Sequence, residues 1–270
     1  MCVCATKNME KDAETMSRGM KRVMSDAKDT TTGLERVRIV SVDGEWRGNN
    51  ALSNGILSLG WVVGRADTME VLEKRRVNFA PMILATATML PNGDPDTERY
   101  YEQAYEQRCL DEFWSQHTDK KAVLERDPMD PMKAIAEFRA VLDRLEQECF
   151  KVVLISDAPG RDFHYINTYL DHAGLPPINT TTTNRYRQVY STEDYARGAM
   201  GLDFDELHLK DAEIIAAFDV PVDQGAHDHM PENDAEYIYK LYFYTVKRAV
   251  ERTKRRKREE SSRIELNEIQ

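Results

Sequence analysis

The sequence contains no run of eighteen apolar residues, so we expect no transmembrane span and no membrane partner. The first thirty-odd residues also lack the apolar segment that a secretory signal needs. This favours an intracellular protein, in the cytoplasm or the nucleus, over a secreted one. The few cysteines lack the spacing of zinc ligands, which favours a reduced protein; they are Cys2, Cys4, Cys109 and Cys149.

Length and composition predict one domain with a polar extension at each end. The chain has 270 residues, which suits one large domain or one domain with extensions. Residues 1–34 are polar and mixed in composition, and we interpret them as a flexible N-terminal arm. The folded domain is expected over residues 35–250, followed by a charged C-terminal tail over residues 251–270.

The charge is distributed unevenly along the chain. The net charge is −10, but the segment from Lys247 to Arg258 holds eight Lys or Arg and one Glu, a local +7, which leaves −17 for the rest. A carboxylate-rich metal site contributes to such acidity, and a local basic strip can still engage phosphates. The strip has three interpretations: a solvated helix end, a nucleic-acid contact or a nuclear localisation signal.

Apolar runs separated by turn residues predict an α/β layered protein. Strands are expected over residues 37–43, 56–63, 71–79 and 151–157. The first three are neighbours along the chain and predict an antiparallel meander. Helical periodicity is expected around residues 135–145, from about 162 to 173, over 211–218 and from about 233 onward.

Two carboxylates stand at the end of the first predicted strand. Asp43 and Glu45 are two residues apart, so on a strand they point to the same face. Two neighbouring anions repel each other unless a cation lies between them. Mg²⁺ and Mn²⁺ are the usual cations for oxygen ligands. The alternative is a strand that runs into an acidic, solvated turn.

Two later segments carry further candidate side chains. Asp157 ends the fourth predicted strand, and Asp162 opens the helix after it, where an acid also suits the helix N-terminus. His227, His229 and Asp234 precede or open the last helix. Asp234 could again be only an N-terminal acid, and a histidine in such a loop could be a surface residue.

Together these segments resemble the DEDDh group of 3′–5′ exonucleases, the DnaQ-like branch of the ribonuclease H-like fold. Asp43 and Glu45 match the first motif and Asp162 the second, while His229 and Asp234 match the third. The resemblance covers residues of about 36–250. It implies an α/β fold with a mixed five-stranded sheet flanked by helices.

The resemblance also guides the choice between neighbouring residues. Asp162 is preferred over Asp157, because the Phe-x-x-Ile spacing that follows it matches the family's helix. His229 is preferred over His227, because only His229 has the four-residue gap to Asp234. The chain departs from the family in the segment 156–160, where many members carry an Asn-rich turn, and in the long gap between the first two motifs.

The resemblance implies phosphodiester hydrolysis with two Mg²⁺ or Mn²⁺ ions roughly 4 Å apart. Asp43 would bridge both ions, Glu45, Asp162 and Asp234 would complete their ligands, and His229 would act as the general base. Trp46 could stack on a terminal base or could anchor the core.

The expected partner is nucleic acid, single-stranded or at its 3′ end. An alternative function is a ribonuclease H-like module that binds nucleic acid without catalysis. Such a module would gain nothing from four converging acids. A ribonuclease H- or integrase-type endonuclease is a further alternative. In that class the first acid lacks a partner two residues later on the strand, so the presence of Glu45 argues against it. The choice of RNA or DNA and the oligomeric state stay open.

Overall fold

The computed structural model describes residues 33–85, 100–179, 188–200, 211–222 and 227–268. The predicted arm, residues 1–34, lies outside this part of the chain except for its last two residues. The described chain begins with a short 3₁₀ turn, η1 (Leu34–Arg36), which leads into the first strand.

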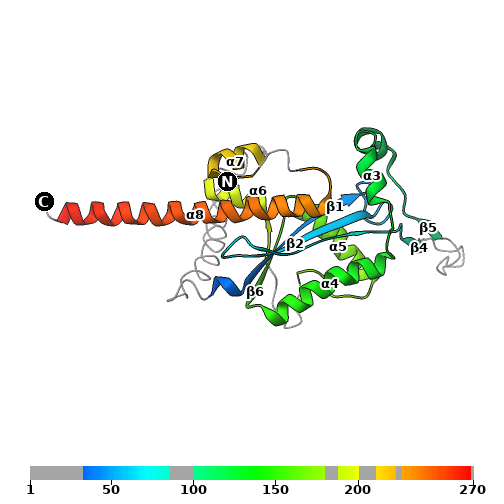
Figure 1. The fold of residues 1–270 in the computed structure, drawn as a ribbon, viewed down its shortest axis with the longest axis horizontal. Coiled ribbons are helices and arrows are strands. Elements are labelled where there is room, and N and C mark those ends of the chain that lie inside the picture. The colour runs from blue at the N-terminus through cyan, green and yellow to red at the C-terminus, as the bar shows by residue number, and fades with distance from the viewer. Residues whose placement is uncertain (1–32, 86–99, 180–187, 201–210, 223–226, 269–270) are drawn as a thin grey trace, which may run out of the picture.

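A five-stranded mixed sheet forms the centre of the protein, in the order β3-β2-β1-β6-β7 (Figure 1). Its strands are β1 (Val37–Trp46), β2 (Ile56–Arg65), β3 (Val71–Asn78), β6 (Lys151–Ser156) and β7 (Gln188–Ser191). The first three form an antiparallel meander, while β6 runs parallel to β1 and β7 parallel to β6. The predicted fold class, a ribonuclease H-like mixed sheet flanked by helices, is confirmed.

Helices cover both faces of the sheet. The helices on one face are α4 (Pro131–Glu148) and α5 (Pro159–His172), and those on the other are α6 (Thr192–Met200), α7 (Asp211–Phe218) and α8 (Pro231–Glu268). The smaller elements are β4 (Ile83–Ala85), β5 (Tyr100–Glu102), α2 (Gln107–Cys109), the π turn η2 (Leu110–Trp114) and α3 (Thr118–Leu124). β4 and β5 pair with each other as a separate two-stranded sheet.

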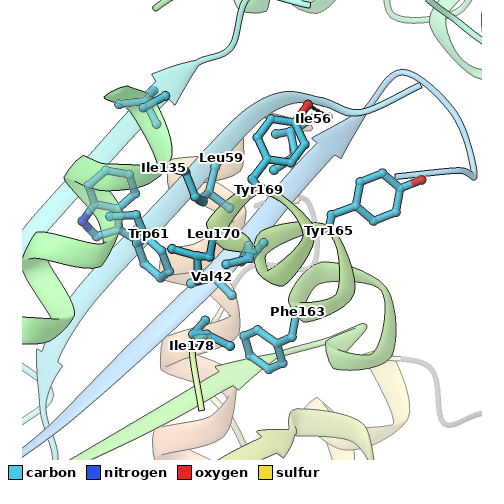
Figure 2. Close-up of a cluster of buried hydrophobic side chains, with 14 of the residues drawn as sticks. Val42, Ile56, Leu59, Trp61, Ile135, Phe163, Tyr165, Tyr169, Leu170 and Ile178 are labelled. Atoms are coloured by element: carbon cyan, nitrogen blue, oxygen red, sulfur yellow. Dashed lines mark hydrogen bonds between the residues drawn. The ribbon is translucent and has the colours of Figure 1, made fainter. Parts of the chain in front are cut away.

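The alternation of β1 separates the core from the opposite face. Val40, Val42 and Trp46 point toward α4 and α5 and join the larger apolar core there. Figure 2 shows this core, in which aromatic residues of α5 meet side chains of β1 and β2. Val37 and Ile39 point to the other face, toward α8. Asp43 and Glu45 share the parity of these two residues.

α8 begins against the sheet and ends in solvent. Ile238, Leu241 and Tyr242 are buried on β1 and β2, whereas the side chains of residues 251–262 are exposed. Figure 1 shows the C-terminal half of α8 running out beyond the other elements. The helix crosses residue 250, the predicted domain end, without a break. None of the helices in the described ranges is long and apolar enough to cross a membrane.

Candidate functional site

The two carboxylates of β1 lie close to the end of the strand, on the face that α8 covers. Asp43 pairs with Gly60 of β2 and Glu45 pairs with Ser58. Both carboxylate side chains are largely buried, with only 8% of each residue exposed. The parallel pairing of β1 with β6 stops at Ser41, so the edge of Asp43 that faces away from β2 is open to groups beyond the end of β6.

The segment that joins β6 to α5 brings two more carboxylates to this edge. β6 pairs with β1 in a register that aligns Ser41 with Ile155, and two residues further on the same register sets Asp157 beside Asp43. Asp162 lies in the first turn of α5 and is buried. The hydroxyl of Ser156 donates a hydrogen bond to the Asp162 carboxylate and accepts one from the backbone N–H of Ala158 at 3.0 Å.

The fifth carboxylate, Asp234, comes from the first turn of α8. It is fully buried, and its Oδ1 accepts a hydrogen bond of 2.9 Å from the backbone N–H of Asp228. Its Oδ2 has no hydrogen-bond partner among the described residues. An unpaired buried oxygen is costly without a ligand, so this atom is suited to a cation.

Gly60 allows the start of α8 to lie against β2. A Cβ atom at this position would overlap the carbonyl group of Pro231 and the backbone nitrogen of Glu232. Four residues along β2, a Cβ at Gly64 would overlap the ring of Tyr239. Gly60 and Gly64 are about 13 Å apart along the strand, and the eight steps from Pro231 to Tyr239 rise about 12 Å along the helix. α8 therefore follows β2 closely over both glycines.

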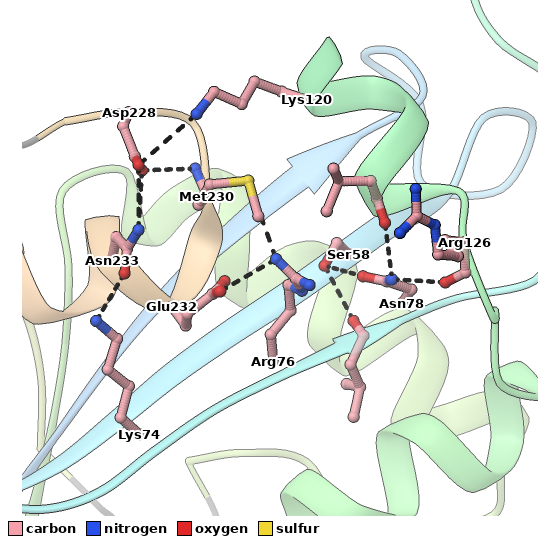
Figure 3. Close-up of polar contacts among 12 residues, drawn as sticks. Ser58, Lys74, Arg76, Asn78, Lys120, Arg126, Asp228, Met230, Glu232 and Asn233 are labelled. Carbon is pink, nitrogen blue, oxygen red and sulfur yellow. Dashed lines mark hydrogen bonds and ion pairs between the residues drawn. The ribbon is translucent and has the colours of Figure 1, made fainter.

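Polar contacts fasten the first turns of α8 to β3 (Figure 3). Lys74 donates to Asn233 at 2.7 Å, and Arg76 pairs with Glu232 at 3.0 Å. Lys74 also donates to Glu236, outside this view, at 2.7 Å. Surface ion pairs of this kind contribute on the order of 0–1 kcal/mol each, so packing carries most of the stability. Their geometric effect is to fix the start of the helix that carries Asp234.

Asp228 closes the N-terminus of α8 from the preceding loop. Its carboxylate accepts hydrogen bonds from the backbone N–H of Met230 and from the side-chain amide of Asn233, both at 3.1 Å, and lies 3.8 Å from the ammonium group of Lys120 (Figure 3). The same residue supplies the N–H that binds Asp234. The loop and the helix therefore hold the Asp234 carboxylate from two sides.

His229 lies at the edge of the carboxylates with a left-handed backbone, at φ 58°. Its Nδ1 lies 3.7 Å from Glu45 Oε1, and this carboxylate raises the pKa of the imidazole above its ordinary value. The rings of Phe113 and His117 pack against it, with centroids at 4.9 and 4.4 Å. The second histidine, His227, directs Nε2 toward Asp234 Oδ2 at 3.6 Å.

The carboxylates raise one another's pKa values. Burial, together with the negative charges of Asp157 and Asp162, raises the pKa of Asp43 well above its ordinary range. Burial and the Asp157 carboxylate have the same effect on the pKa of Asp162. The pKa of Asp234 is raised to about 6, chiefly by burial. A site that gathers this much unfavourable negative charge in one place is suited to cations.

The donor atoms fall into two all-oxygen groups that share one residue. Asp43, Glu45 and Asp234 offer carboxylate oxygens that lie within 4.8 Å of one another, and so do Asp43, Asp157 and Asp162. All-oxygen sets are those that Mg²⁺ and Mn²⁺ prefer, so the residues present fit these ions. The arrangement allows two ions with Asp43 between them.

The structure brings the residues chosen from the sequence together, with one exception. Asp43, Glu45, Asp162, Asp234 and His229 all border the same site. Trp46 does not, because it has the opposite parity on β1. It is 6% exposed and its ring packs on Tyr165 with centroids 4.3 Å apart, which favours the core-anchoring alternative over base stacking.

Besides His227, Asp157 and His117 border the site, although the sequence does not select them. The resemblance prefers Asp162 over Asp157, yet Asp157 joins a donor group with Asp43 and Asp162. Its position after β6, in register with Asp43, is the signal that could have found it. His117 packs on His229 from a distant segment, and no spacing pattern indicates that contact.

No family model matches the sequence, and no curated protein matches it. Solved structures do match. The nuclease domain of 3′hExo, described as a DEDDh family member and bound to rAMP, is 11% identical with a TM-score of 0.51; the match covers 80% of this chain and 94% of that one. A zinc-bound complex of Escherichia coli exonuclease I with single-stranded DNA is 9% identical with a TM-score of 0.52, and the match covers 78% of this chain.

These matches show a shared fold at very low sequence identity. The match spans about two fifths of the length of the exonuclease I chain, 40%, so that protein contains much that this chain does not share. The 3′hExo domain, in contrast, is matched over nearly its whole length. This chain therefore shares the fold of the 3′hExo nuclease domain over nearly the whole length of that domain.

Proposed function

We propose that this chain is a metal-dependent 3′–5′ exonuclease of the DEDDh family, which hydrolyses phosphodiester bonds of RNA or DNA. The observation that carries the proposal is the pair of carboxylate groups that share Asp43, with His229 at their edge. The fold shared with the 3′hExo nuclease domain supports it. A binding module without catalysis would have no use for five buried or converging acids that destabilise one another.

Each of these residues would have its own role in the hydrolysis. Asp43 would contact both divalent ions, with Glu45 and Asp234 on one side and Asp162, assisted by Asp157, on the other. When bound, Mg²⁺ or Mn²⁺ supplies the positive charge that the scissile phosphate requires in the transition state. His229 would take the proton from the attacking water, and the Glu45 carboxylate beside it would stabilise the resulting imidazolium.

The test is cleavage of 5′-labelled RNA and DNA oligonucleotides by the purified protein, with and without a chelator. We expect stepwise shortening from the 3′ end in Mg²⁺ or Mn²⁺, loss of cleavage in EDTA, and recovery when the metal is restored. Cleavage that persists in excess chelator would remove the metal from the mechanism. Products cut internally from the start would point to an endonuclease on the same fold.

His229→Ala should lower the rate constant on the order of 10²-fold or more, because general base catalysis contributes that much. His227→Ala is the matched control, since it removes an imidazole only two residues away, and it should change the Mg²⁺-supported rate little. Single-turnover rates of both variants at saturating Mg²⁺ give the comparison. The opposite ranking would make His227 the general base.

Deleting residues 251–270 should weaken binding of long substrates and leave cleavage of a dinucleotide almost unchanged. The strip Lys247–Arg258 begins about 20 Å and ends about 36 Å along α8 from Asp234, so only a long substrate reaches it.

The affinity for long substrates should also depend less steeply on salt after this deletion. The log–log slope is expected to fall by about 0.7 for each phosphate of a single strand that the tail no longer neutralises. Glutamine at Lys254, Arg256, Lys257 and Arg258 is the matched variant that keeps helix length and removes charge. Equal losses on long and short substrates would show that the tail supports the fold instead.

A further inference from the structure

A third group of donor atoms lies beside the two all-oxygen groups and differs from them in chemistry. His227, His229 and Asp234 each offer one ligand atom, and these atoms lie within 4.8 Å of one another. Two of the three donors are imidazole nitrogens. The nuclease mechanism uses His229 and Asp234 in separate roles and leaves His227 without one.

The separation of two donor atoms in this group is close to that required by a small tetrahedral ion. Bonds of about 2.0–2.1 Å to a tetrahedral ion set the ligand atoms about 3.3–3.4 Å apart. His227 Nε2 and Asp234 Oδ2 are separated by 3.6 Å. Asp234 Oδ2 is also the buried oxygen without a hydrogen-bond partner among the described residues.

The group is open to ions from solvent. The side chains of His227 and His229 are 37% and 26% exposed, while Asp234 forms the buried floor. Nitrogen donors of this type bind Zn²⁺ far better than Mg²⁺, which prefers oxygen and near-octahedral geometry. Selectivity between the two ions therefore follows from the donor atoms.

We propose that His227, His229 and Asp234 form a Zn²⁺ site, with water as the fourth ligand, and that Zn²⁺ bound there inhibits the nuclease. The inhibitory half rests on the proposed function. Oδ1 of Asp234 is already engaged with the Asp228 N–H, so Oδ2 is the oxygen that both kinds of ion require. A Zn²⁺ ion bound to Oδ2 occupies the oxygen that the divalent ion of the all-oxygen group needs. The same Zn²⁺ ion binds the His229 imidazole, which must be free to accept a proton.

The binding test uses metal-free protein and does not depend on activity. Co²⁺ is the spectroscopic probe, because a tetrahedral site with nitrogen donors gives intense visible absorption, and competition with Zn²⁺ in excess Mg²⁺ then yields the affinity. His227→Gln should weaken Zn²⁺ binding by at least about 10-fold, since losing even a residue that only supports a ligand costs 10–100-fold. His117→Gln, which alters the neighbouring ring outside the donor group, should leave it unchanged.

The activity test follows on the same variants. In Mg²⁺, Zn²⁺ near stoichiometric amounts should inhibit the wild type and His117→Gln, while His227→Gln should keep its Mg²⁺-supported rate and require at least about 10-fold more Zn²⁺. Equal Zn²⁺ affinity in the wild type and His227→Gln would overturn the site. Zn²⁺ binding that depends on His227 in a protein without nuclease activity in any metal would uphold the site and overturn the proposed function.

Discussion

Asp43→Asn is expected to abolish metal-dependent hydrolysis and to raise the melting temperature of the metal-free protein. Asp43 is the residue common to both all-oxygen groups, so its loss removes a ligand from each ion at once. Asparagine keeps the size of the side chain and can still accept a hydrogen bond, which leaves the pairing of β1 with β2 intact. Activity is measured at saturating Mg²⁺ and Mn²⁺, so that a weakened affinity alone cannot explain the loss.

The gain in heat stability follows from the pKa of Asp43. Burial and the neighbouring carboxylates raise this pKa well above its ordinary range, so ionisation of Asp43 at neutral pH destabilises the folded state. An amide at this position carries no charge and removes that cost. For a domain of this size each kcal/mol of relief raises Tm by roughly 2–4 °C.

The same reasoning fixes the pH dependence. For Asp234, whose pKa rises from 3.8 to about 6 on folding, the folded state binds the proton more tightly than the unfolded state. The contribution of Asp234 to the stability of the metal-free wild type should thus fall as pH rises from about 4 to about 6 and level off above that range, and Mg²⁺ should restore stability by mass action. An Asp43→Asn protein that retains most of its activity, or that melts at a lower temperature at pH 7, would contradict this assignment.

Gly60→Ala is expected to lower the rate on the order of 10²-fold, although glycine has no side chain that could take part in the reaction. The added methyl group would overlap the backbone of Pro231 and Glu232, so the first turn of α8 must move away from β2. Asp234 lies in that turn, and Gly60 is paired directly with Asp43. A displacement of about 1 Å between groups that must act together costs about 10²-fold in rate.

Gly160→Ala is the matched control for this change. Gly160 lies in the first turn of α5, near Asp162, and a Cβ there would meet no atom of the described residues within 4 Å. Alanine in a helical position removes about 0.4–1 kcal/mol of unfolded-state entropy, so this variant should be active and slightly more stable. Comparing the rate constants and the metal affinities of the two variants separates displacement of Asp234 from a general effect of added bulk. Full activity in Gly60→Ala would mean that the helix adjusts without moving its carboxylate.

The part of the site that the sequence could predict rests on strand alternation. Asp43 and Glu45 belong to a strand whose successive side chains point to opposite faces of the sheet. Because the two acids are two residues apart, they share one face. The same rule gives the outcome for Trp46, which stands an odd number of positions from both acids and therefore points to the core. The order of the five strands was predictable only through the resemblance to a known fold.

Other parts of the site depend on contacts that no local pattern records. Asp157 and Asp162 flank the same strand–helix junction, and spacing alone cannot choose between them. α5 begins at Pro159, ahead of Asp162, which sets both carboxylates near Asp43. The role of Gly60 requires knowledge of which helix covers β2, and that helix starts about 170 residues later.

Because its two faces serve different purposes, β1 can accept changes of residue far more readily than changes of length. Removing one residue between Ile39 and Asp43 would turn every later side chain of the strand to the opposite face. The two carboxylates would then enter the apolar core beneath α4 and α5, and the indole of Trp46 would face α8. We therefore expect selection to confine insertions and deletions to the segments between strands, and to hold the number of residues in β1 constant even where its side chains vary.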